Sequence, residues 1–522
     1  MDHDDVQVED QRFEDDEDGH GNEVTVEQLK AMLRGGERRK VIVFKFGGTT
    51  AGSNKQDARL RDARLLIEQR LNEGYFVVPV FSAYKRLGEG RQRKVGITDL
   101  LLEYREVIGS KETEREGVKE FRRQLVEPHL ELLRDLGIID RNTSDEDLRK
   151  ASFKSTGKFF EDFQREINAI VGDAATFNKF IPGQGAIDHL VAGGERLMVK
   201  IVAEYFNRKW REAGFAWRAV PATARDVGVL TDNRFGDANI LDDSLKLIYS
   251  LTNKFRKRQE VPILTGFDGI FKTVDSAGRE RRYTTTLGRS GSDLTATYVG
   301  YAMMAEATCL VKDTDGVLTA DPRYVPDART IDYLSYDLAV EAGNIMTKAV
   351  KPAMDGQMDL IVMNPKNPAV FTRIGPEVRR TGPVLITNPD RCRYVRVNMG
   401  DSLSFSKLYE ELRRTNPTLF ELYHTGEHVS FIIKGTKLPR SFVDYLMALK
   451  GVEIIDTPAW FFQVVGYMSR EHIQRFNEYL DTLQQLSGPR WFEGSKSMNV
   501  CLREEGTDIG GVLREIHERF VK

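Results

Sequence analysis

The stretch from Thr284 to Asp293 gathers residue types that bind anions. It reads Thr284-Thr-Thr-Leu-Gly-Arg-Ser-Gly-Ser-Asp293 and runs into an apolar segment, Leu294 to Ala305. Gly288 and Gly291 let the backbone pass close to a ligand, and the hydroxyls and free N–H groups at a helix start favour anions. Arg289 can bind a carboxylate through two parallel hydrogen bonds. The stretch therefore predicts a phosphate-and-carboxylate loop that opens a helix.

The same stretch has a plainer interpretation, in which a turn leads into a capped helix with Ser292 or Asp293 as the N-cap. Gly-Ser loops before helices are common, so the stretch alone does not decide between the two interpretations. The decision depends on the other candidate binding residues in the chain.

A second group of candidates lies near the start of the chain. Lys40 to Phe46 is a β-rich run that breaks at Gly47-Gly48, and Asp57 to Leu71 then has helical periodicity. Tyr75 to Phe81 follows as a buried strand, which completes the β-loop-α-β unit of a parallel sheet that binds ligands at its strand ends. The turn is not a P-loop, because Lys45 precedes the glycines. A nucleotide site of another architecture stays open.

Glu195 is a third candidate, because it follows two glycines at the predicted start of a helix that continues to Phe206. It could stay unpaired to bind a substrate ammonium. The alternative is an acid that simply complements the helix dipole. His189, which has no partner nearby in sequence, is predicted to be structural and not a metal ligand.

Charged residues recur where further predicted strands end. Strands are predicted at Ala216 to Val220, Val261 to Phe267 and Ala307 to Lys312. Such convergence from distant parts of the chain suits a phosphate-donor site. The polar segments that follow the third strand are Asp313-Thr-Asp-Gly316, Thr319-Ala-Asp-Pro-Arg323 and a helix at Ser335 to Met346 with Lys348 just beyond.

Composition sets limits on the class of protein. A chain of 522 residues suggests about three domains. A net charge of −3 gives no basic excess for nucleic acid or an anionic membrane, and no apolar run approaches the roughly 20 residues of a membrane span. Residues 1–22 form an acidic tail predicted to be disordered. Three widely spaced cysteines predict a reducing, cytoplasmic location with no disulfide framework and no zinc site.

The predicted domain organisation has three parts. Residues 1–38 hold the acidic tail and a short helix, and residues 39–380 form an α/β domain with a helical insertion at about 99–180. Residues 390–522 alternate strands and helices as two small α+β modules, the second from about 459. In the second half of this region, strands are predicted at Gly451 to Ile455 and at Phe461 to Gly466.

Taken together, the motifs resemble the aspartate kinases of the amino acid kinase family over about residues 40 to 375, and the C-terminal modules resemble their paired ACT domains. Several motifs in the same order and spacing make the resemblance specific. They are Lys45-Phe-Gly-Gly-Thr-Thr50, Ser82-Ala83 with Ile97-Thr-Asp99, Gly194-Glu-Arg196, Ala224-Arg-Asp226 with Thr231-Asp-Asn-Arg-Phe235, Thr286-Leu-Gly-Arg-Ser-Gly-Ser-Asp293 and Asp313-Thr-Asp-Gly-Val-Leu-Thr-Ala-Asp-Pro-Arg323.

The resemblance implies an open, mainly parallel eight-stranded sheet between helical layers, and a kinase that transfers phosphate from ATP with Mg²⁺ to aspartate. Lys45 and Asp293 would be catalytic, with Lys45 at the transferring phosphoryl group and Asp293 positioning the lysines. The residues implied to bind aspartate are Ser82, Thr98, Glu195, Arg289 and Ser292, and those implied to bind the nucleotide are Lys45, Gly47, Gly48, Asp313, Arg323 and Lys348. No metal ligand is implied.

The family also implies a homodimer or tetramer with an amino-acid effector at the ACT modules. Two alternatives stay open: a relative that phosphorylates another amino acid, and a catalytically silent amino-acid sensor. The sequence departs from the family mainly on the nucleotide side. Lys312 replaces the usual threonine, Leu318 replaces an aromatic residue, and Asn344 to Pro352 keeps only Lys348 and the proline.

Overall fold

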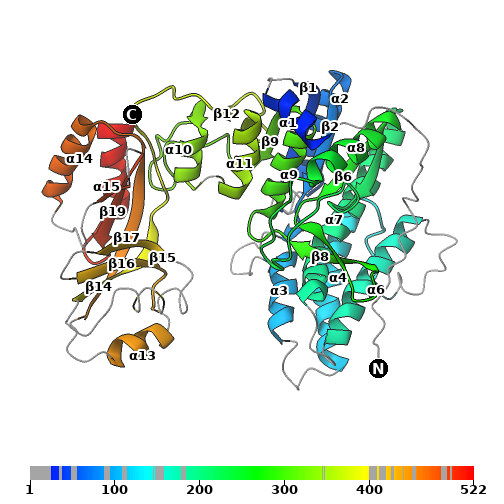
Figure 1. Ribbon diagram of the computed structural model, residues 1–522, viewed down its shortest axis with the longest axis horizontal. Helices are drawn as coiled ribbons and strands as arrows, with labels where there is room; N and C mark the ends of the chain where they lie inside the picture. Colours follow the sequence, from blue (N-terminus) through cyan, green and yellow to red (C-terminus); the bar gives the residue numbers. More distant parts are fainter. Residues whose placement is uncertain are drawn as a thin grey trace.

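The computed structural model describes residues 25–34, 38–48, 56–86, 95–107, 115–144, 146, 158–177, 184–343, 345, 347–398, 408, 410, 419–424, 428–438, 440–448, 454–483, 491–493 and 496–522. The predicted acidic tail lies outside these residues. The described chain forms two parts that lie side by side (Figure 1), with α10 and β12 between them.

An eight-stranded sheet organises the first part, in the order β10-β12-β11-β9-β1-β2-β6-β5. Every neighbouring pair is parallel except β11 with β12. This confirms the open, mainly parallel sheet expected from the sequence. The strands are β1 (Arg39–Phe46), β2 (Phe76–Phe81), β5 (Arg218–Ala222), β6 (Glu260–Thr265), β9 (Ala305–Val311), β10 (Tyr333–Ser335), β11 (Asp359–Met363) and β12 (Phe371–Gly375).

Helices cover both faces of this sheet because its central strands are apolar on both sides. Along β1, Phe44 packs in one core cluster and Val43 in the other, as the twofold alternation of a strand requires. One face is covered by α2 (Gln56–Asn72), α3 (Ile97–Val107), α4 (Arg115–Asp135), α6 (Lys158–Phe177) and α7 (Gln184–Glu212). The other is covered by α8 (Ser244–Lys257), α9 (Gly291–Ala302), α10 (Tyr336–Glu341) and α11 (Thr347–Gly356), with α1 (Val26–Arg34) beside α8 and α11.

The structure corrects the predicted helix start at Glu195. Helix α7 is continuous from Gln184 to Glu212, so Glu195 lies in its interior. Gly193 and Gly194 do not form a turn; they allow neighbouring helices to pack closely against α7. A Cβ at Gly194 would lie 2.8 Å from Ile97 Cγ2, and one at Gly193 would lie 2.6 Å from Ile170 Cδ1. Glycine therefore lets α3 and α6 approach α7.

The structure also corrects the predicted N-cap of α9. This helix begins at Gly291, and its N-cap is Ser290, which takes the left-handed conformation with φ of 56° and makes no side-chain cap. Residues 284–286 belong to strand β8 (Glu280–Thr286), which forms a hairpin with β7 (Asp268–Val274), and they lie buried at the base of that hairpin. Neither Ser292 nor Asp293 caps the helix, because both side chains bond to groups from other elements.

A second, largely antiparallel sheet organises the C-terminal part, in the order β15-β16-β14-β17-β19-β18, with β13 also pairing with β17. The two strands predicted at 451–455 and 461–466 form one strand, β17 (Ile454–Tyr467). Its first half pairs with β14 and its second half with β19 and β13. The other elements are β13 (Gly382–Ile386), β14 (Asp390–Asn398), β15 (Leu419–His424), β16 (His428–Lys434), β18 (Trp491–Glu493), β19 (Ser497–Arg503), α13 (Arg440–Ala448), α14 (Arg470–Thr482), α15 (Ile509–Ile516) and a terminal π-helix, η1 (His517–Val521).

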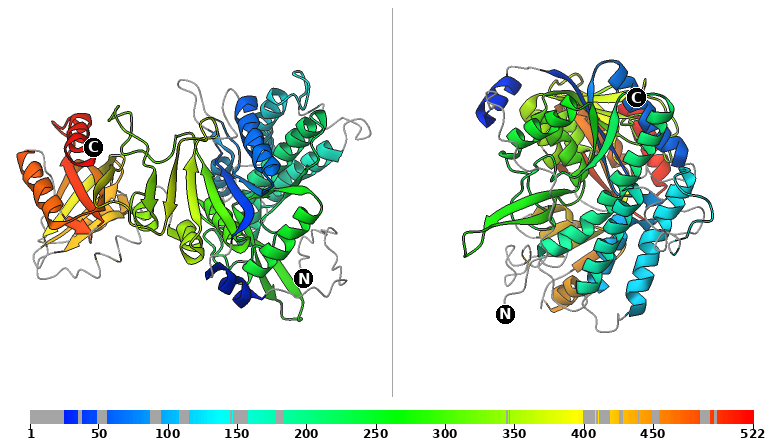
Figure 2. Two further views of the ribbon diagram at one scale, coloured as in Figure 1. Left: turned by 90° about the horizontal axis from the view of Figure 1, so that it is seen from above. Right: turned by 90° about the vertical axis from the view of Figure 1, so that its right-hand side faces the viewer.

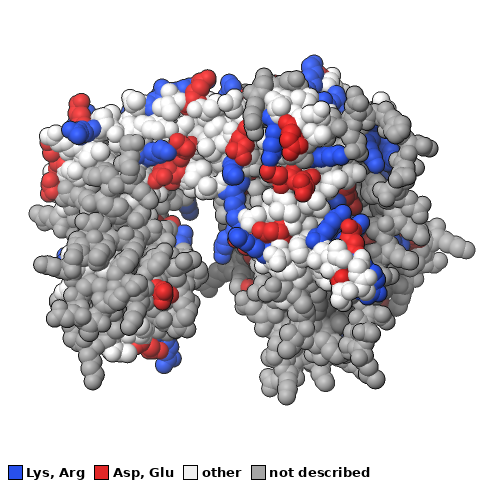
Figure 3. Space-filling model, in the orientation of Figure 1, with Lys and Arg blue, Asp and Glu red and all other residues white. Residues whose placement is uncertain are grey.

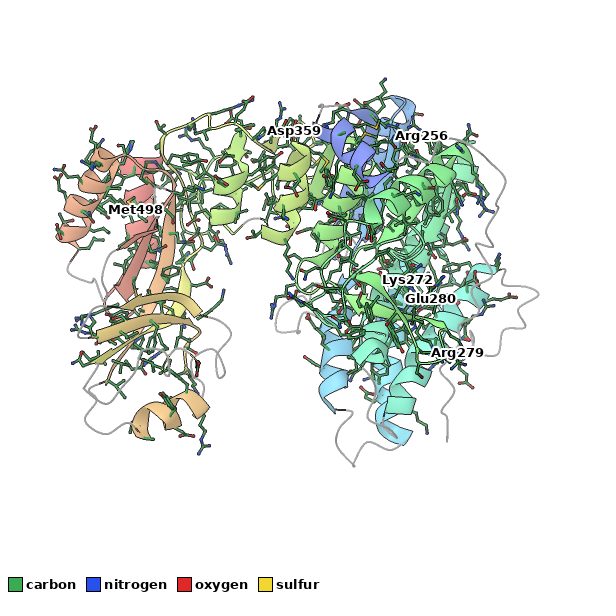
Figure 4. The ribbon with its side chains drawn as sticks, viewed as in Figure 1. Arg256, Lys272, Arg279, Glu280, Asp359 and Met498 are labelled. Carbon is green, nitrogen blue, oxygen red and sulfur yellow. The ribbon has the colours of Figure 1, made fainter. Side chains whose placement is uncertain are left out.

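The two parts contact each other through the region of α10 and through a segment after β9 (Figure 2). Lys496 Nζ lies 2.8 Å from Asp337 Oδ2, and Ser335 Oγ lies 3.0 Å from Tyr467 OH. Ala320 and other residues of the segment after β9 pack in the same core cluster as Met498 of β19, which Figure 4 labels. That segment therefore belongs to the core of the C-terminal part as well.

Candidate functional site

The candidate site lies at the carboxyl ends of strands β1, β2, β6 and β9, which is where parallel sheets bind ligands. Lys45 projects from the end of β1, and Asp293 lies in the first turn of α9. Lys45 Nζ is 2.9 Å from Asp293 Oδ1, and the two side chains are only 17% and 11% exposed. Because the ion pair is largely shielded from water, its electrostatic attraction is strong and can hold the Lys45 ammonium in position to bind an anion.

A second set of contacts surrounds the Glu195 carboxylate. Its Oε2 accepts hydrogen bonds from the backbone N–H groups of Gly266 at 2.6 Å and Phe267 at 2.7 Å. Its Oε1 accepts one from Ser292 Oγ at 2.8 Å, and Ser82 Oγ donates to Ser292 Oγ at 3.0 Å. The predicted residues Ser82, Glu195 and Ser292 therefore form one chain of hydrogen bonds, and Asp293 follows Ser292 directly.

Burial controls the charge of Glu195. The carboxyl is 4% exposed, and its burial raises the pKa to about 7. The hydrogen bonds from Gly266, Ser292 and Phe267 lower the pKa, while the nearby carboxylate of Asp268 raises it. A buried acid that titrates near neutrality is a common feature of functional sites.

Helix α7 is held by a polar cluster one residue beyond Glu195. Arg196 Nε donates to Glu166 Oε1 at 2.6 Å, and Arg196 Nη1 donates to the carbonyl oxygen of His189 at 2.9 Å. His189 Nδ1 lies 3.0 Å from Thr284 Oγ1. Its pKa is lowered to about 3, first by the Arg196 charge and then by burial. His189 therefore has the structural surroundings that the sequence suggested.

Two glycines of the predicted loops have a physical requirement for glycine. A Cβ at Gly48 would lie 2.5 Å from the carbonyl oxygen of Ala83, so the turn after β1 passes directly over the end of β2. Gly288 has φ of +73°, and a Cβ there would lie 2.4 Å from Asp237 Oδ1. Gly47, which joins the end of β1 to Gly48, is half-buried.

The remaining predicted residues are not joined to the Lys45–Asp293 pair or to the Glu195 hydrogen bonds, although Lys348 pairs with Asp237, which lies against Gly288. Arg289 is exposed on the loop before α9, and Thr98 is half-buried in α3. Arg323 is exposed and pairs with Asp321, two residues earlier in the chain, at 2.5 Å. Lys348 Nζ pairs with Asp237 Oδ1 at 2.7 Å, and Asp313 is exposed after the end of β9.

Two features near the carboxyl end of β9 were not predicted from the sequence. The Asp315 carboxylate accepts hydrogen bonds from the side-chain amides of Asn364 and Asn367, both at 2.8 Å. These residues follow β11 and fix the turn after β9. The other feature is Lys312, whose pKa is lowered by burial and which interacts electrostatically with Asp293 and Lys45. In the sequence, Lys312 stands out only as a departure from the family pattern.

Charged side chains of both signs are interspersed over the described part of the face shown in Figure 3.

Among the described residues, no group of three or more His, Cys, Asp or Glu side chains could hold a metal ion. Within the same residues, no helix has the length and apolar character needed to cross a bilayer. The Cys309 thiol is buried in a sheet strand, and burial raises its pKa to about 12.

Comparison with known sequences shows what the chain resembles. A family model described as the amino acid kinase family matches residues 40–364. Aspartokinase 2, chloroplastic, of Arabidopsis thaliana is 33% identical over 187 residues, which are 35% of this chain and 32% of that protein. An aspartokinase of Bacillus sp. (strain MGA3) is 32% identical over 171 residues, which are 33% of this chain and 37% of that protein. The match spans about a third of the length of these relatives.

Comparison with solved structures extends the likeness to both parts of the chain. E. coli aspartokinase III in complex with lysine and aspartate has a TM-score of 0.69 at 19% identity, covering 93% of this chain and all of that one. The same enzyme in complex with aspartate and ADP has a TM-score of 0.63 at 20% identity, with 92% and 99% covered. At this identity the likeness shows a shared fold.

Proposed function

Because the chain belongs to the amino acid kinase family, we propose that it is an aspartate kinase, which transfers the γ-phosphoryl group of ATP to the side-chain carboxylate of L-aspartate. The product would be 4-phospho-L-aspartate, the first intermediate toward the aspartate-derived amino acids such as lysine. The observation that carries the proposal is the adjacency of two sites. The Lys45–Asp293 ion pair for phosphate and the Glu195–Ser292 contact for an ammonium meet at the start of α9.

Phosphoryl transfer to the aspartate carboxylate does not require the protein to remove a proton. The nucleophile is a carboxylate of pKa about 4, which is ionised at neutral pH, so no general base is required. Its oxygen attacks the γ-phosphorus, the bond to the bridging oxygen breaks, and ADP leaves with the electron pair. The site must align two anions and neutralise charge on the phosphoryl oxygens. Lys45, held by Asp293, has the charge and shielding for that task.

The substrate-side roles follow from residue chemistry. Glu195 would accept the ammonium of aspartate and Arg289 would bind a carboxylate, with Ser82, Thr98 and Ser292 lining the same pocket. The nucleotide side would hold Gly47, Gly48, Asp313, Arg323 and Lys348.

Mg²⁺ would reach the site on the nucleotide, since phosphates and water supply most ligands of such an ion. When bound, Mg²⁺ neutralises phosphate charge. A cytoplasmic enzyme that forms a homodimer or tetramer and binds an amino-acid effector at its C-terminal part completes the proposal. The effector draws on the likeness in fold to an aspartokinase solved in complex with lysine and aspartate.

A hydroxamate assay with ATP-Mg tests this function directly, because hydroxylamine traps acyl phosphates. Wild-type protein is expected to give an aspartate-dependent signal, and Lys45→Met or Asp293→Ala to lower kcat at least about 100-fold, the scale for removing one preorganised electrostatic group. Signal only with another amino acid would assign a different acceptor, and no signal with any would favour a sensor. Wild-type turnover in Lys45→Met would refute the catalytic role of that lysine.

A further inference from the structure

Strand register places a second lysine beside Lys45. Strands β1 and β9 are parallel neighbours in which Lys45 is paired with Leu310. Side chains two residues apart on a strand share a face, so Lys312, two residues after Leu310, leaves the sheet on the same side as Lys45. Leu310 packs in the core cluster that α9 covers, together with Val43 of β1. Both lysines therefore emerge under the first turn of α9, where Asp293 lies.

The charges around Lys312 agree with this placement. Burial lowers the pKa of its ammonium, the Asp293 and Asp313 carboxylates raise it, and the Lys45 ammonium lowers it. The backbone N–H of Lys312 donates to the Met363 carbonyl oxygen at 2.9 Å, which ties the end of β9 to β11. Of the two acids that act on Lys312, only Asp293 is buried between the lysines, whereas Asp313 is exposed. A bound phosphoryl group would place further negative charge next to both ammonium groups.

We propose that Lys312 is a second ammonium that binds the γ-phosphoryl group of ATP, opposite Lys45 and with Asp293 positioning both lysines. The inference deepens the proposed kinase function and rests on it. As the bond from the γ-phosphorus to the bridging oxygen breaks, negative charge shifts onto oxygens that both lysines can contact. The competing explanation is that Lys312 only balances the charge of Asp293 and never touches the nucleotide.

Nucleotide titration without any amino acid separates these two explanations. We would measure the Kd of ATP-Mg and ADP-Mg by calorimetry for the wild type and for Lys312→Met. A hydrogen bond from an ammonium to the γ-phosphate is lost only for ATP, so Lys312→Met is expected to weaken ATP about 10-fold or more relative to ADP. A lysine that only balances Asp293 would leave the ratio of the two Kd values unchanged, and that result would overturn the proposal.

Two further variants guard against misfolding and general charge effects. Lys312→Thr has a smaller side chain of the type that aspartate kinases carry at this position, and is expected to show the same relative loss of ATP affinity. Lys272→Met removes a lysine from the β7–β8 hairpin, where Figure 4 shows it beside Glu280, 4.0 Å away. This control is expected to keep the wild-type ratio. An equal loss in Lys272→Met would also overturn the proposal, because the effect would then be one of net charge.

The turnover measurement adds a second readout. In the hydroxamate assay, kcat of Lys312→Met is expected to fall by at least about 10-fold, because the second ammonium acts on charge that develops during transfer. The titration contains no acceptor, so its result holds even if the wild type proves to phosphorylate an acid other than aspartate. The hydroxamate assay therefore tests the proposed function, whereas the nucleotide titration tests the role of Lys312.

Discussion

Glu195 combines two opposing influences within one carboxyl group. Burial favours the neutral acid, whereas two backbone N–H groups and the Ser292 hydroxyl favour the carboxylate. The effect of burial is larger, and it raises the pKa of Glu195 to about 7, well above the usual value of a glutamate. A substrate ammonium would pair with the carboxylate form only. The free protein is therefore expected to exchange a proton for the substrate near neutral pH.

This competition predicts the pH dependence of the reaction. Below pH 7 most Glu195 is protonated, so binding the substrate ammonium must first release that proton. The kcat/KM for aspartate is therefore expected to rise with pH through about 7 and to level off above it. A pH profile between about 5.5 and 8.5 measures this rise.

Glu195→Gln supplies the control for that profile. Glutamine keeps the shape and accepts hydrogen bonds but does not titrate, so kcat/KM should be low and should lose the rise near pH 7. The KM for ATP should stay near the wild-type value. An unchanged rise in Glu195→Gln would assign the titration to another group, such as a substrate phosphate.

At the scale of elements, α7 carries Glu195, the proposed ammonium-binding residue, to the candidate site. Its glycines Gly193 and Gly194 lie in the helix interior, where glycine usually costs up to about 1 kcal/mol relative to alanine. Close packing against Ile97 of α3 and Ile170 of α6 explains why they are tolerated. Glu195 follows them directly, so the spacing of α3 and α7 also fixes the carboxylate beside Ser292.

Gly194→Ala tests this packing. The new Cβ would lie 2.8 Å from Ile97 Cγ2 and 3.2 Å from Ala83 Cβ, so neighbours must move. Overpacking of this kind costs about 1 to 3 kcal/mol, which should exceed the gain in helix propensity. We expect a lower midpoint of urea unfolding and a higher KM for aspartate. Gly172→Ala in α6 is the matched control: its Cβ would meet nothing within 4 Å, so this variant should be as stable as the wild type or more so.

The parts that the sequence predicted, and those that it did not, have physical reasons. Alternating or continuous apolar runs such as Lys40 to Phe46 determine strands locally, so most strands of the large sheet were predictable. The continuity of α7 was not, because glycine pairs signal turns unless a close neighbour in space requires them. The single strand β17 was missed because Asp456-Thr-Pro458 interrupts its apolar pattern, while its partners lie far apart in sequence.

The residues of the candidate site also divide into those that the sequence predicted and those that it did not. Motif spacing brought forward Lys45, Asp293, Glu195 and Ser292, which the fold places in direct contacts. Lys312 carries no recognisable motif, and its relation to Lys45 depends on strand register, which a sequence does not state. Because β1 and β9 are far apart in the chain, the proximity of Lys312 to Lys45 can be recognised only in the three-dimensional structure.

At the scale of the whole molecule, the C-terminal part packs against the segment after β9, which carries one of the proposed nucleotide-binding residues. Thr319 Oγ1 lies 2.8 Å from His517 Nε2, and both residues are buried. The same hydroxyl accepts a hydrogen bond from the backbone N–H of Arg329 at 2.9 Å, and the backbone N–H of Ile386 donates to the Thr319 carbonyl oxygen at 2.9 Å. Arg323, a proposed nucleotide-binding residue, lies four positions further along this segment.

Thr319→Val tests whether that contact connects the two parts functionally. Valine keeps the volume but leaves the buried His517 Nε2 and the Arg329 N–H without this partner, at a cost of about 1 to 3 kcal/mol. We expect a lower Tm and, because the segment that carries Arg323 loosens, a higher KM for ATP with an unchanged KM for aspartate. Thr314→Val, at an exposed position of the same segment, should change the Tm little. A lower Tm in Thr319→Val with wild-type KM for ATP would show that the contact holds the two parts together without influencing the nucleotide.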